Sequence, residues 1–199
     1  MFTSFGFYQI KKIVKKNYVS VKPINQTMIH VLIMCFTVKP IGKIHTPYKP
    51  GERNPPFQSV EDETQTFYID VYPKHTKRLE KLELFTYIYL LYYLDQSKKK
   101  PKELVSPPWT KNANIGLFAS RSPNRINPIG LSVVKLKEIK ENRIIISGID
   151  AFDNTPLLDI KPYIKDLDSK TDANYGWLEN EEDSKKHLQL HIKGIPHKH

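Results

Sequence analysis

A ten-residue segment, residues 121–130, concentrates side chains that could hold an anion. Its sequence, RSPNRINPIG, contains two arginines four residues apart, two asparagines and two prolines. Guanidinium groups form forked hydrogen bonds with carboxylates or phosphates, and asparagine can pair with the edge of a base. Pro123 and Pro128 fix φ, which lowers the entropy lost when the segment closes on a ligand. The alternative interpretation is a well-capped turn whose arginines are solvated.

A second segment, residues 149–163, carries three aspartates around a corner. Its sequence is IDAFDNTPLLDIKPY, with AspAsnThrPro at the turn itself. Asp and Asn are common turn residues, so a purely structural corner is the simpler interpretation. The carboxylates could instead bind ribose hydroxyls or accept a proton. Asp150 and Asp153 are the two candidates for a general base, and the sequence does not rank them.

Several well-known sites are excluded because their motifs are absent. All eight glycines stand apart, so neither G-x-G-x-x-G nor G-x-x-x-x-G-K-[ST] can be written, and H-E-x-x-H and G-x-S-x-G are missing too. Cys35 is the single cysteine, which excludes an intramolecular disulfide and a zinc finger. His187 and His191 have a spacing that binds metals weakly, but a solvated tail is the better interpretation. We expect no metal site.

The charge balance favours a polyanionic partner. The formal net charge is +10, and neutralising phosphates would release counterions. The first fifty residues contain eight lysines and no Asp or Glu. Residues 1–34 are therefore interpreted as a basic N-terminal extension, either an RNA-binding arm, a poorly ordered segment or a mis-assigned start with translation beginning at Met34. No apolar run approaches the roughly 20 residues of a membrane span, so we expect a cytoplasmic protein with no membrane association.

From about Thr37 onward the pattern predicts β-structure interrupted by proline. Residues 67–72 alternate and stop at Pro73, residues 74–82 form a helical turn, and residues 98–109 read as a long loop. Residues 85–94 are apolar on both faces, which predicts a central strand; their five aromatic residues could stack bases, but core packing is favoured. Residues 131–136 and 143–149 form a strand pair joined through GluAsn, and residues 158–160 form a last short strand ending before Pro162.

The fold class is therefore mainly β, because fifteen prolines and short strands favour a barrel or sandwich over alternating β-α units. The missing glycine fingerprint excludes a Rossmann-type cofactor site. We assign residues 35–168 to a single β-domain. Residues 169–199 form a polar C-terminal tail that covers an edge or forms a helix over residues 181–190.

Five ordered motifs together resemble the TrmO (TsaA-like) family of tRNA methyltransferases. They are IGKIHTPYK at Ile41, PPFQS at Pro55, LEKLELFTYIYLLYYLDQ at Leu79, GLFASRSPNRINPIGLS at Gly116, and the aspartate corner described above. The resemblance runs from about Val38 to about Asp168. Any one motif alone would be weak, but the ordered set is highly specific.

The resemblance implies a β-barrel methyltransferase that uses S-adenosyl-L-methionine, forms a homodimer and methylates N6-threonylcarbamoyladenosine just 3′ of the tRNA anticodon. It also implies a set of cofactor contacts. These are Phe57, Gln58, Ser59, Asp95, Gln96, Arg121, Leu131, Asp153, Asn154, Thr155 and Pro156. From their chemistry, we assign Arg125 and Asn127 to the threonyl carboxylate or the anticodon backbone.

Three positions depart from the family pattern. Asn154 replaces a usual glycine, and asparagine tolerates the positive φ that glycine adopts in such a turn. Ile126 replaces a proline, and Asp95 stands where bacterial members often have histidine. Two rival interpretations remain, namely an RNA-binding barrel without catalysis and a methyltransferase with another RNA or a small molecule as acceptor.

Overall fold

The computed structural model describes residues 37–56, 61, 64–97, 100–107, 110, 113–180 and 189–190. The described fold lies in the unit Lys39–His199. The predicted basic extension, residues 1–34, lies outside the described residues. Of the helix expected over residues 181–190, only Gln189 and Leu190 are described, and their backbone is helical.

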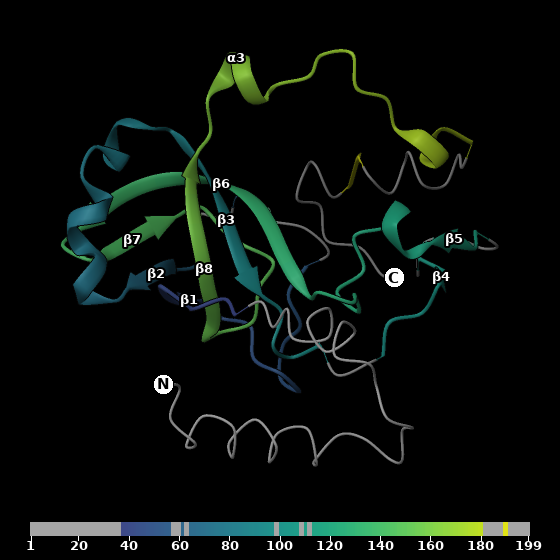
Figure 1. Cartoon of the computed structure of the whole chain (residues 1–199), viewed down its shortest axis with the longest axis horizontal. Coiled ribbons are helices and arrows are strands. Elements are labelled where there is room, and N and C mark those ends of the chain that lie inside the picture. Colours follow the sequence, from purple (N-terminus) through teal and green to yellow (C-terminus); the bar gives the residue numbers. More distant parts are fainter. Residues whose placement is uncertain are drawn as a thin grey trace, which may run out of the picture. The chain divides into compact units, whose positions relative to one another are not determined.

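A closed antiparallel barrel of six strands forms the body of this unit, in the order β1-β2-β7-β6-β3-β8. Figure 1 shows β8 lying between β1 on one side and β3 and β6 on the other. This confirms the mainly β fold class. The strands are β1 (Gly42–His45), β2 (Phe67–Val71), β3 (Tyr87–Tyr93), β6 (Ile129–Lys140), β7 (Arg143–Ile146) and β8 (Thr155–Pro162).

Along most of the strand length every second side chain fills the barrel interior, as the two-residue period of a strand requires. Most of its members are aliphatic or aromatic and many of these are completely buried, whereas Ser132 and Thr155 are buried polar members. The apolar members include Ile44, Phe67, Ile69, Val71, Ile88, Leu90, Tyr92, Val134, Ile144, Ile146 and Leu157. The interior is therefore a packed hydrophobic core.

Two short 3-10 helices, η1 (Pro73–Leu79) and η2 (Leu82–Leu84), follow β2. Pro73 supplies the fixed φ that suits a first helical position, and Leu79 is buried against the core. The helical turn predicted for residues 74–82 is thus confirmed in type, although Lys81 adopts a left-handed conformation with φ of 68° that separates two helices. These helices lie at the end of the barrel where β2 finishes.

The strand pair predicted for residues 131–136 and 143–149 is confirmed as β6 and β7. Both strands differ in length from the prediction, and they meet at a two-residue turn in which Glu141 has a φ of 55°. The side chain of Asn142 donates a hydrogen bond of 2.6 Å to the carbonyl of Val71 and so ties this turn to β2.

The interpretation of β3 as a strand buried on both faces is wrong. Ile88, Leu90 and Tyr92 point into the barrel, whereas Tyr87 and Tyr93 are exposed and the alternate residues between them are half-buried. A closed barrel has only one interior, so the aromatic side chains of the other face lie on its outer surface.

Two further strand predictions require correction. The last strand is β8, which is longer than residues 158–160 and includes both Pro156 and Pro162. Residues 98–109 are not all loop, because β4 (Leu104–Val105) pairs with β5 (Ile115–Gly116) in a separate two-stranded sheet. Figure 1 shows this small sheet away from the barrel strands. Sequence patterns miss such two-residue strands because they are too short to show a period.

The described C-terminal elements are the short helix α3 (Lys165–Asp168) and the 3-10 helix η4 (Gly176–Asn180). The indole nitrogen of Trp177 in η4 donates a hydrogen bond of 2.9 Å to the carbonyl of Ala119. Ala119 ends η3 (Leu117–Ala119), so this bond joins the tail to the segment before Arg121. Among the described residues, no helix has the length and hydropathy that crossing a membrane requires.

Candidate functional site

Most of the described residues that the sequence predicts as cofactor or substrate contacts lie at one end of the barrel. At this end β1 and β3 finish while β6 and β8 begin, as shown by the pairing of Tyr92 with both Gly130 and Leu157 and of Ile44 with Thr155. Antiparallel strands place such starts and ends side by side. The aspartate corner, the turn after β3 and the start of β6 therefore share one rim.

A buried network of two hydroxyls and one carboxylate lies beneath this rim. Tyr92 and Ser132 lie 2.9 Å apart, and both hydroxyls donate to the same oxygen of Asp150, at 3.1 Å and 2.8 Å. Burial, together with the charge of Asp150, raises the pKa of the Tyr92 phenol well above its ordinary value. Because β3, β6 and the loop after β7 each contribute one member, the network fixes these segments relative to one another. Because the Asp150 carboxylate already accepts two hydrogen bonds, a structural role is favoured for it over abstraction of a proton from the substrate.

The corner before β8 is held through Asp153. One carboxylate oxygen lies 3.2 Å from Nδ1 of His45 and accepts a hydrogen bond of 3.3 Å from the backbone amide of Thr46. The other oxygen accepts from the side-chain amide of Asn154 at 2.8 Å. Asn154 has a φ of 65°, so the expectation that asparagine preserves a left-handed turn here is confirmed.

His45 connects this corner to the ion pair of Asp70 and Arg143 on the outer face of β1, β2 and β7. Its Nε2 lies 3.6 Å from a carboxylate oxygen of Asp70, and its ring stacks on that of Tyr68 with centroids 4.6 Å apart. Arg143 donates two hydrogen bonds to Asp70, at 2.7 Å and 2.9 Å. This bidentate contact holds the pKa of the Asp70 carboxyl below its ordinary value. His45 thus stands between two carboxylates, one of which belongs to the predicted cofactor corner.

The arginine segment is attached to the turn that follows β3. The amide of Leu94 donates to the carbonyl of Pro128 at 2.8 Å. The hydroxyl of Ser97 lies within hydrogen-bond distance of the Pro123 carbonyl and of the side-chain oxygen of Asn124, at 3.0 Å and 2.9 Å. Asp95 and Gln96 lie in that turn, are exposed, and bond to each other at 3.0 Å. The structure therefore brings these two residues together with the segment that contains Arg121 and Arg125.

The two arginines have different surroundings. Arg125 is half-buried, and its Nη1 donates to the carbonyls of Ser120 and Leu117 at 2.8 Å and 3.4 Å, so it braces its own loop. Arg121 is exposed. Asn127 is exposed as well, and its carbonyl accepts a bond from the Ile129 amide. Substrate contacts by Arg125 and Asn127 stay a prediction.

The remaining residues that were predicted to contact the cofactor differ in their exposure, and some of them are not described. Leu131 lies on the outer face of β6 and is 62% exposed, opposite Leu91 of β3. Thr155 is buried and Pro156 half-buried at the start of β8. Phe57, Gln58 and Ser59 lie outside the described residues. Within the described part of the chain, no group of three or more His, Cys, Asp and Glu side chains is arranged to hold a metal ion.

Comparison with known proteins identifies the family. The model of the tRNA-methyltransferase O N-terminal domain matches residues 43–169. The chain belongs to this family. The predicted resemblance to TrmO proteins is confirmed, over nearly the same range as the five motifs.

Relatives and a solved structure agree with this membership. A "Probable S-adenosyl-L-methionine-binding protein" of Pyrococcus abyssi is 38% identical over 76% of this chain and 80% of its own. The mouse tRNA (adenine(37)-N6)-methyltransferase is 41% identical, but the match covers 49% of this chain and 22% of the mouse protein. The crystal structure of TrmO from Pseudomonas aeruginosa superposes with a TM-score of 0.59 and 32% identity, covering 72% of this chain and 62% of that one.

The sequence interpretation missed three residues that shape the site of this TrmO-family barrel. His45 stood inside a quoted motif, but nothing near it indicated that Asp153 would be its partner. Tyr92 and Ser132 also stood inside quoted motifs, but neither was assigned a role in the site. A buried strand that carries a hydroxyl at an inward position is the one available signal, because buried polar groups need a hydrogen-bond partner.

Proposed function

We propose that this chain transfers the methyl group of S-adenosyl-L-methionine to N6 of N6-threonylcarbamoyladenosine, next to the anticodon of tRNA. The observation that carries the proposal is the convergence of three predicted segments at one rim of a TrmO-family barrel. These are the aspartate corner, the turn at Asp95 and the arginine segment. The net charge of +10 agrees with a tRNA substrate, and we propose that the enzyme acts in the cytoplasm.

The side chains at this rim have the chemistry that the cofactor requires. S-adenosyl-L-methionine presents a carboxylate, an ammonium group, ribose hydroxyls and an aromatic base. Arg121 can meet the carboxylate, the carboxylates of Asp95 and Asp153 can meet the ammonium group or the ribose, and the exposed side chain of Leu131 can meet the base. The donor set therefore fits the cofactor without a glycine-rich loop.

The bound cofactor would supply a reactive sulfonium methyl group for in-line displacement. The main contribution of the protein is then to position the reactants, which can lower a barrier by roughly 7–11 kcal/mol. Tyr92, Ser132 and Asp150 hold β3, β6 and the loop after β7 in a fixed relation. His45 and Thr46 fix the orientation of the Asp153 carboxylate.

A homodimer is part of the same proposal, and an exposed apolar face supports it. Tyr93, Ile129 and Val133 are 44%, 42% and 42% exposed on the outer face of β3 and β6, where Tyr93 pairs with Ile129. Sedimentation equilibrium tests this part: Val133→Lys should shift the protein toward monomer. Leu84→Lys, at an exposed leucine on η2, should not. A monomeric wild type would contradict the proposal.

Nucleoside mass spectrometry tests the reaction. The full chain is incubated with isotope-labelled S-adenosyl-L-methionine and with tRNA that carries N6-threonylcarbamoyladenosine, and the tRNA is then digested. We expect one labelled methyl group on that nucleoside. A label on a different nucleoside would refute the acceptor but retain methyl transfer. Absence of cofactor binding in calorimetry would refute the enzyme and favour an RNA-binding barrel without catalysis.

A further inference from the structure

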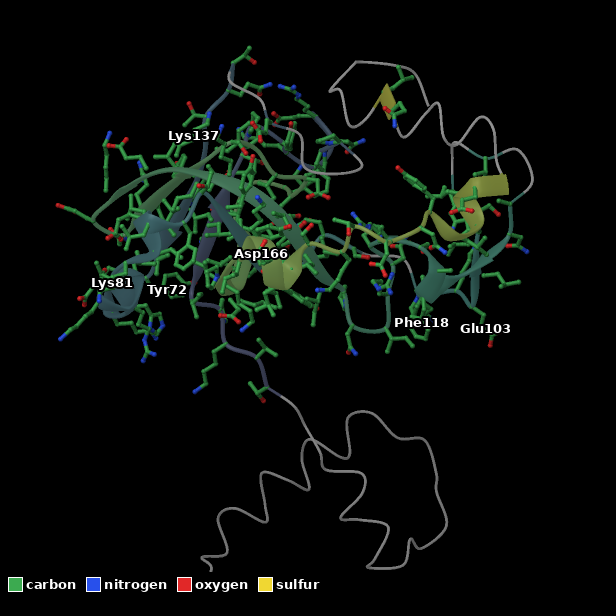
Figure 2. The ribbon with its side chains drawn as sticks, turned by 90° about the horizontal axis from the view of Figure 1, so that it is seen from above. Tyr72, Lys81, Glu103, Phe118, Lys137 and Asp166 are labelled. Carbon is green, nitrogen blue, oxygen red and sulfur yellow. The ribbon has the colours of Figure 1, made fainter. Side chains whose placement is uncertain are left out.

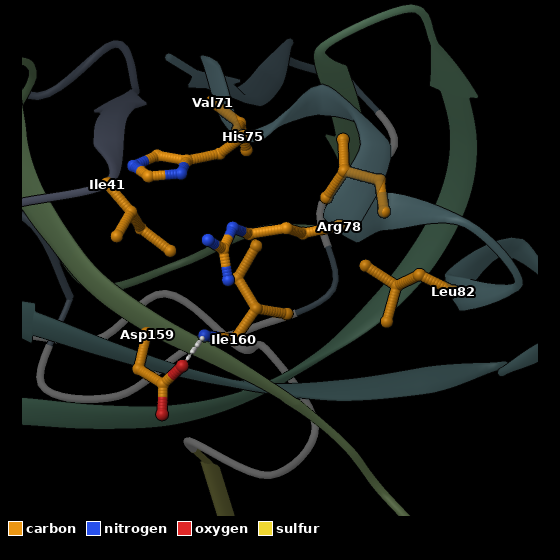
Figure 3. Close-up of a pocket in the computed structure, with 8 residues that line it drawn as sticks. Ile41, Val71, His75, Arg78, Leu82, Asp159 and Ile160 are labelled. Carbon is orange, nitrogen blue, oxygen red and sulfur yellow. Dashed lines mark hydrogen bonds between the residues drawn. The ribbon is translucent and has the colours of Figure 1, made fainter. Parts of the chain in front are cut away.

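A cavity that no predicted site residue lines lies where η1 and η2 pack against the barrel (Figure 3). Its volume is about 370 Å³, which falls at the small end of the range found for ligand pockets. Five of its lining residues are aliphatic and three are polar or charged. The lining consists of Ile41, Val71, His75, Arg78, Leu79, Leu82, Asp159 and Ile160.

Two nitrogen-bearing side chains from η1 face this cavity. In Figure 3, the ring of His75 and the guanidinium of Arg78 extend from the same helix toward the strand that carries Ile160. Nδ1 of His75 is buried and has no hydrogen-bond partner among the described residues. A buried nitrogen without a hydrogen-bond partner carries a desolvation cost, which a bound ligand could remove. Arg78 is exposed, so its guanidinium adds positive charge at the mouth.

The carboxylate on the same wall already has hydrogen-bonding and charged partners. Asp159 accepts a hydrogen bond of 2.9 Å from the backbone amide of Ile160, and its other oxygen lies 2.9 Å from Nζ of Lys161. The ion pair with Asp159 raises the pKa of the Lys161 ammonium. Asp159 therefore has its cationic partner in Lys161, whereas Arg78 is the one cation among the described residues that line the cavity.

The cavity is separate from the candidate site at the other rim. Asp159 and Ile160 lie four and five residues beyond Thr155 along β8, which corresponds to about 13–16 Å at roughly 3.3 Å per residue. Ile41 precedes the start of β1 and Val71 ends β2, so the cavity belongs to the opposite end of the barrel. A ligand here would not occupy the space assigned to the methyl donor.

We propose that this cavity binds a small organic anion, namely a carboxylate with a short branched aliphatic chain. The carboxylate would accept hydrogen bonds from Arg78 and from Nδ1 of His75 when that nitrogen carries its proton. The aliphatic chain would rest on Ile41, Leu82 and Ile160. A cavity of this size with an apolar floor and two donors at one side matches this class in volume and in polarity.

Methyl-resolved NMR of the full chain tests the proposal with 4-methylpentanoate as the probe. Isotope-labelled isoleucine, leucine and valine methyl groups report on the cavity directly. Titration should shift the resonances of Ile41, Val71 and Ile160 and leave those of Val133, on the outer face of β6, unchanged. Acetate, which lacks the aliphatic chain, and 4-methylpentanamide, which lacks the charge, should each bind roughly tenfold more weakly or worse.

Matched variants locate the charge that matters. Arg78→Gln should weaken binding of 4-methylpentanoate by roughly tenfold or more, because it removes a charged donor. Lys77→Gln, at the exposed neighbour on the same helix that does not line the cavity, should leave it unchanged. Absence of shifts at millimolar probe, shifts confined to other methyl groups, equal binding of acetate, or full retention of affinity in Arg78→Gln would each overturn the proposal.

Discussion

The ring of Tyr92 lies directly on Gly130, its partner across the β3–β6 ladder. A Cβ atom added to Gly130 would lie 2.2 Å from Cε2 and 2.4 Å from Cζ of that ring. The ring has little freedom to move away, because its hydroxyl is bound to Ser132 and Asp150 in the buried network. Glycine at position 130 therefore serves close packing, although it lies in a strand, where it lowers intrinsic stability.

Gly130→Ala is expected to destabilise the fold by about 1–3 kcal/mol, the usual cost of overpacking a core. The free energy of unfolding from urea denaturation measures this. Gly116→Ala is the matched control, because no atom of the described residues other than its chain neighbours lies within 4 Å of a Cβ placed there, and its φ of −57° suits alanine. Equal losses in the two variants would show that the contact between Tyr92 and Gly130 has no energetic consequence.

The raised pKa of Tyr92 predicts a loss of stability at high pH. In the unfolded chain the phenol ionises near its ordinary pKa of about 10, whereas in the folded protein burial keeps it protonated. Above that pH the unfolded state binds fewer protons than the folded state, so the free energy of unfolding falls as pH rises, by at most about 1.4 kcal/mol per pH unit. Below the ordinary pKa this contribution is fully present.

Comparing variants isolates the contribution of this tyrosine from that of the others. Tyr92→Phe should reduce stability near neutral pH by about 0.5–1.5 kcal/mol through the lost hydrogen bonds, and its stability should fall less steeply above pH 10. Tyr175→Phe, at an exposed position, should follow the wild type. Parallel curves for Tyr92→Phe and the wild type would contradict the assignment.

The sequence predicted those parts of the fold that depend on local signals. Isolated glycines and frequent prolines excluded a Rossmann fold and favoured a mainly β structure. The Glu-Asn pair between two apolar runs predicted the β6–β7 hairpin. Neighbouring residues determine such features, so a single pattern contains the information. The left-handed turn at Asn154 was expected from the family resemblance, because glycine is usual at that position and asparagine tolerates the same positive φ.

Features that depend on distant partners were not predictable in this way. His45 and Asp153 are 108 residues apart, and Tyr92 is 40 residues from Ser132 and 58 from Asp150. An apolar run such as β3 fits a strand buried on both faces as well as a barrel wall, because the pattern does not say which elements cover it. The closed barrel in the structure shows that β3 is buried on a single face.

His45→Ala is expected to weaken binding of S-adenosyl-L-methionine by roughly two- to tenfold, because Asp153 loses a partner that fixes its carboxylate. This expectation rests on the proposed function. Calorimetry measures the affinity, and the rate of methyl transfer at saturating cofactor should change little. Lys43→Ala, at an exposed residue two positions earlier on β1, is the control. Unchanged affinity in His45→Ala would remove His45 from the site.

The two arginines of the segment between η3 and β6 are expected to separate into a structural and a ligand-binding residue. Arg125→Ala removes the bonds to the carbonyls of Ser120 and Leu117 and the contact of its guanidinium with the Phe118 ring, 5.8 Å away. Figure 2 shows Phe118 close to Glu103 of the adjoining segment, and the amide of Leu117 donates to the Glu103 carbonyl at 2.9 Å. The lost contacts should therefore loosen this part of the loop.

Hydrogen exchange distinguishes the two roles. The amide of Ser120, which donates to the carbonyl of Leu117 at 3.2 Å, should exchange roughly tenfold faster in Arg125→Ala, because the local opening free energy falls by about 1.4 kcal/mol. Arg121→Ala should leave that rate unchanged, since Arg121 is exposed, and should instead weaken cofactor binding. If Arg125→Ala left the exchange of Ser120 unchanged and reduced only tRNA methylation, Arg125 would be a substrate contact and not a brace of the loop.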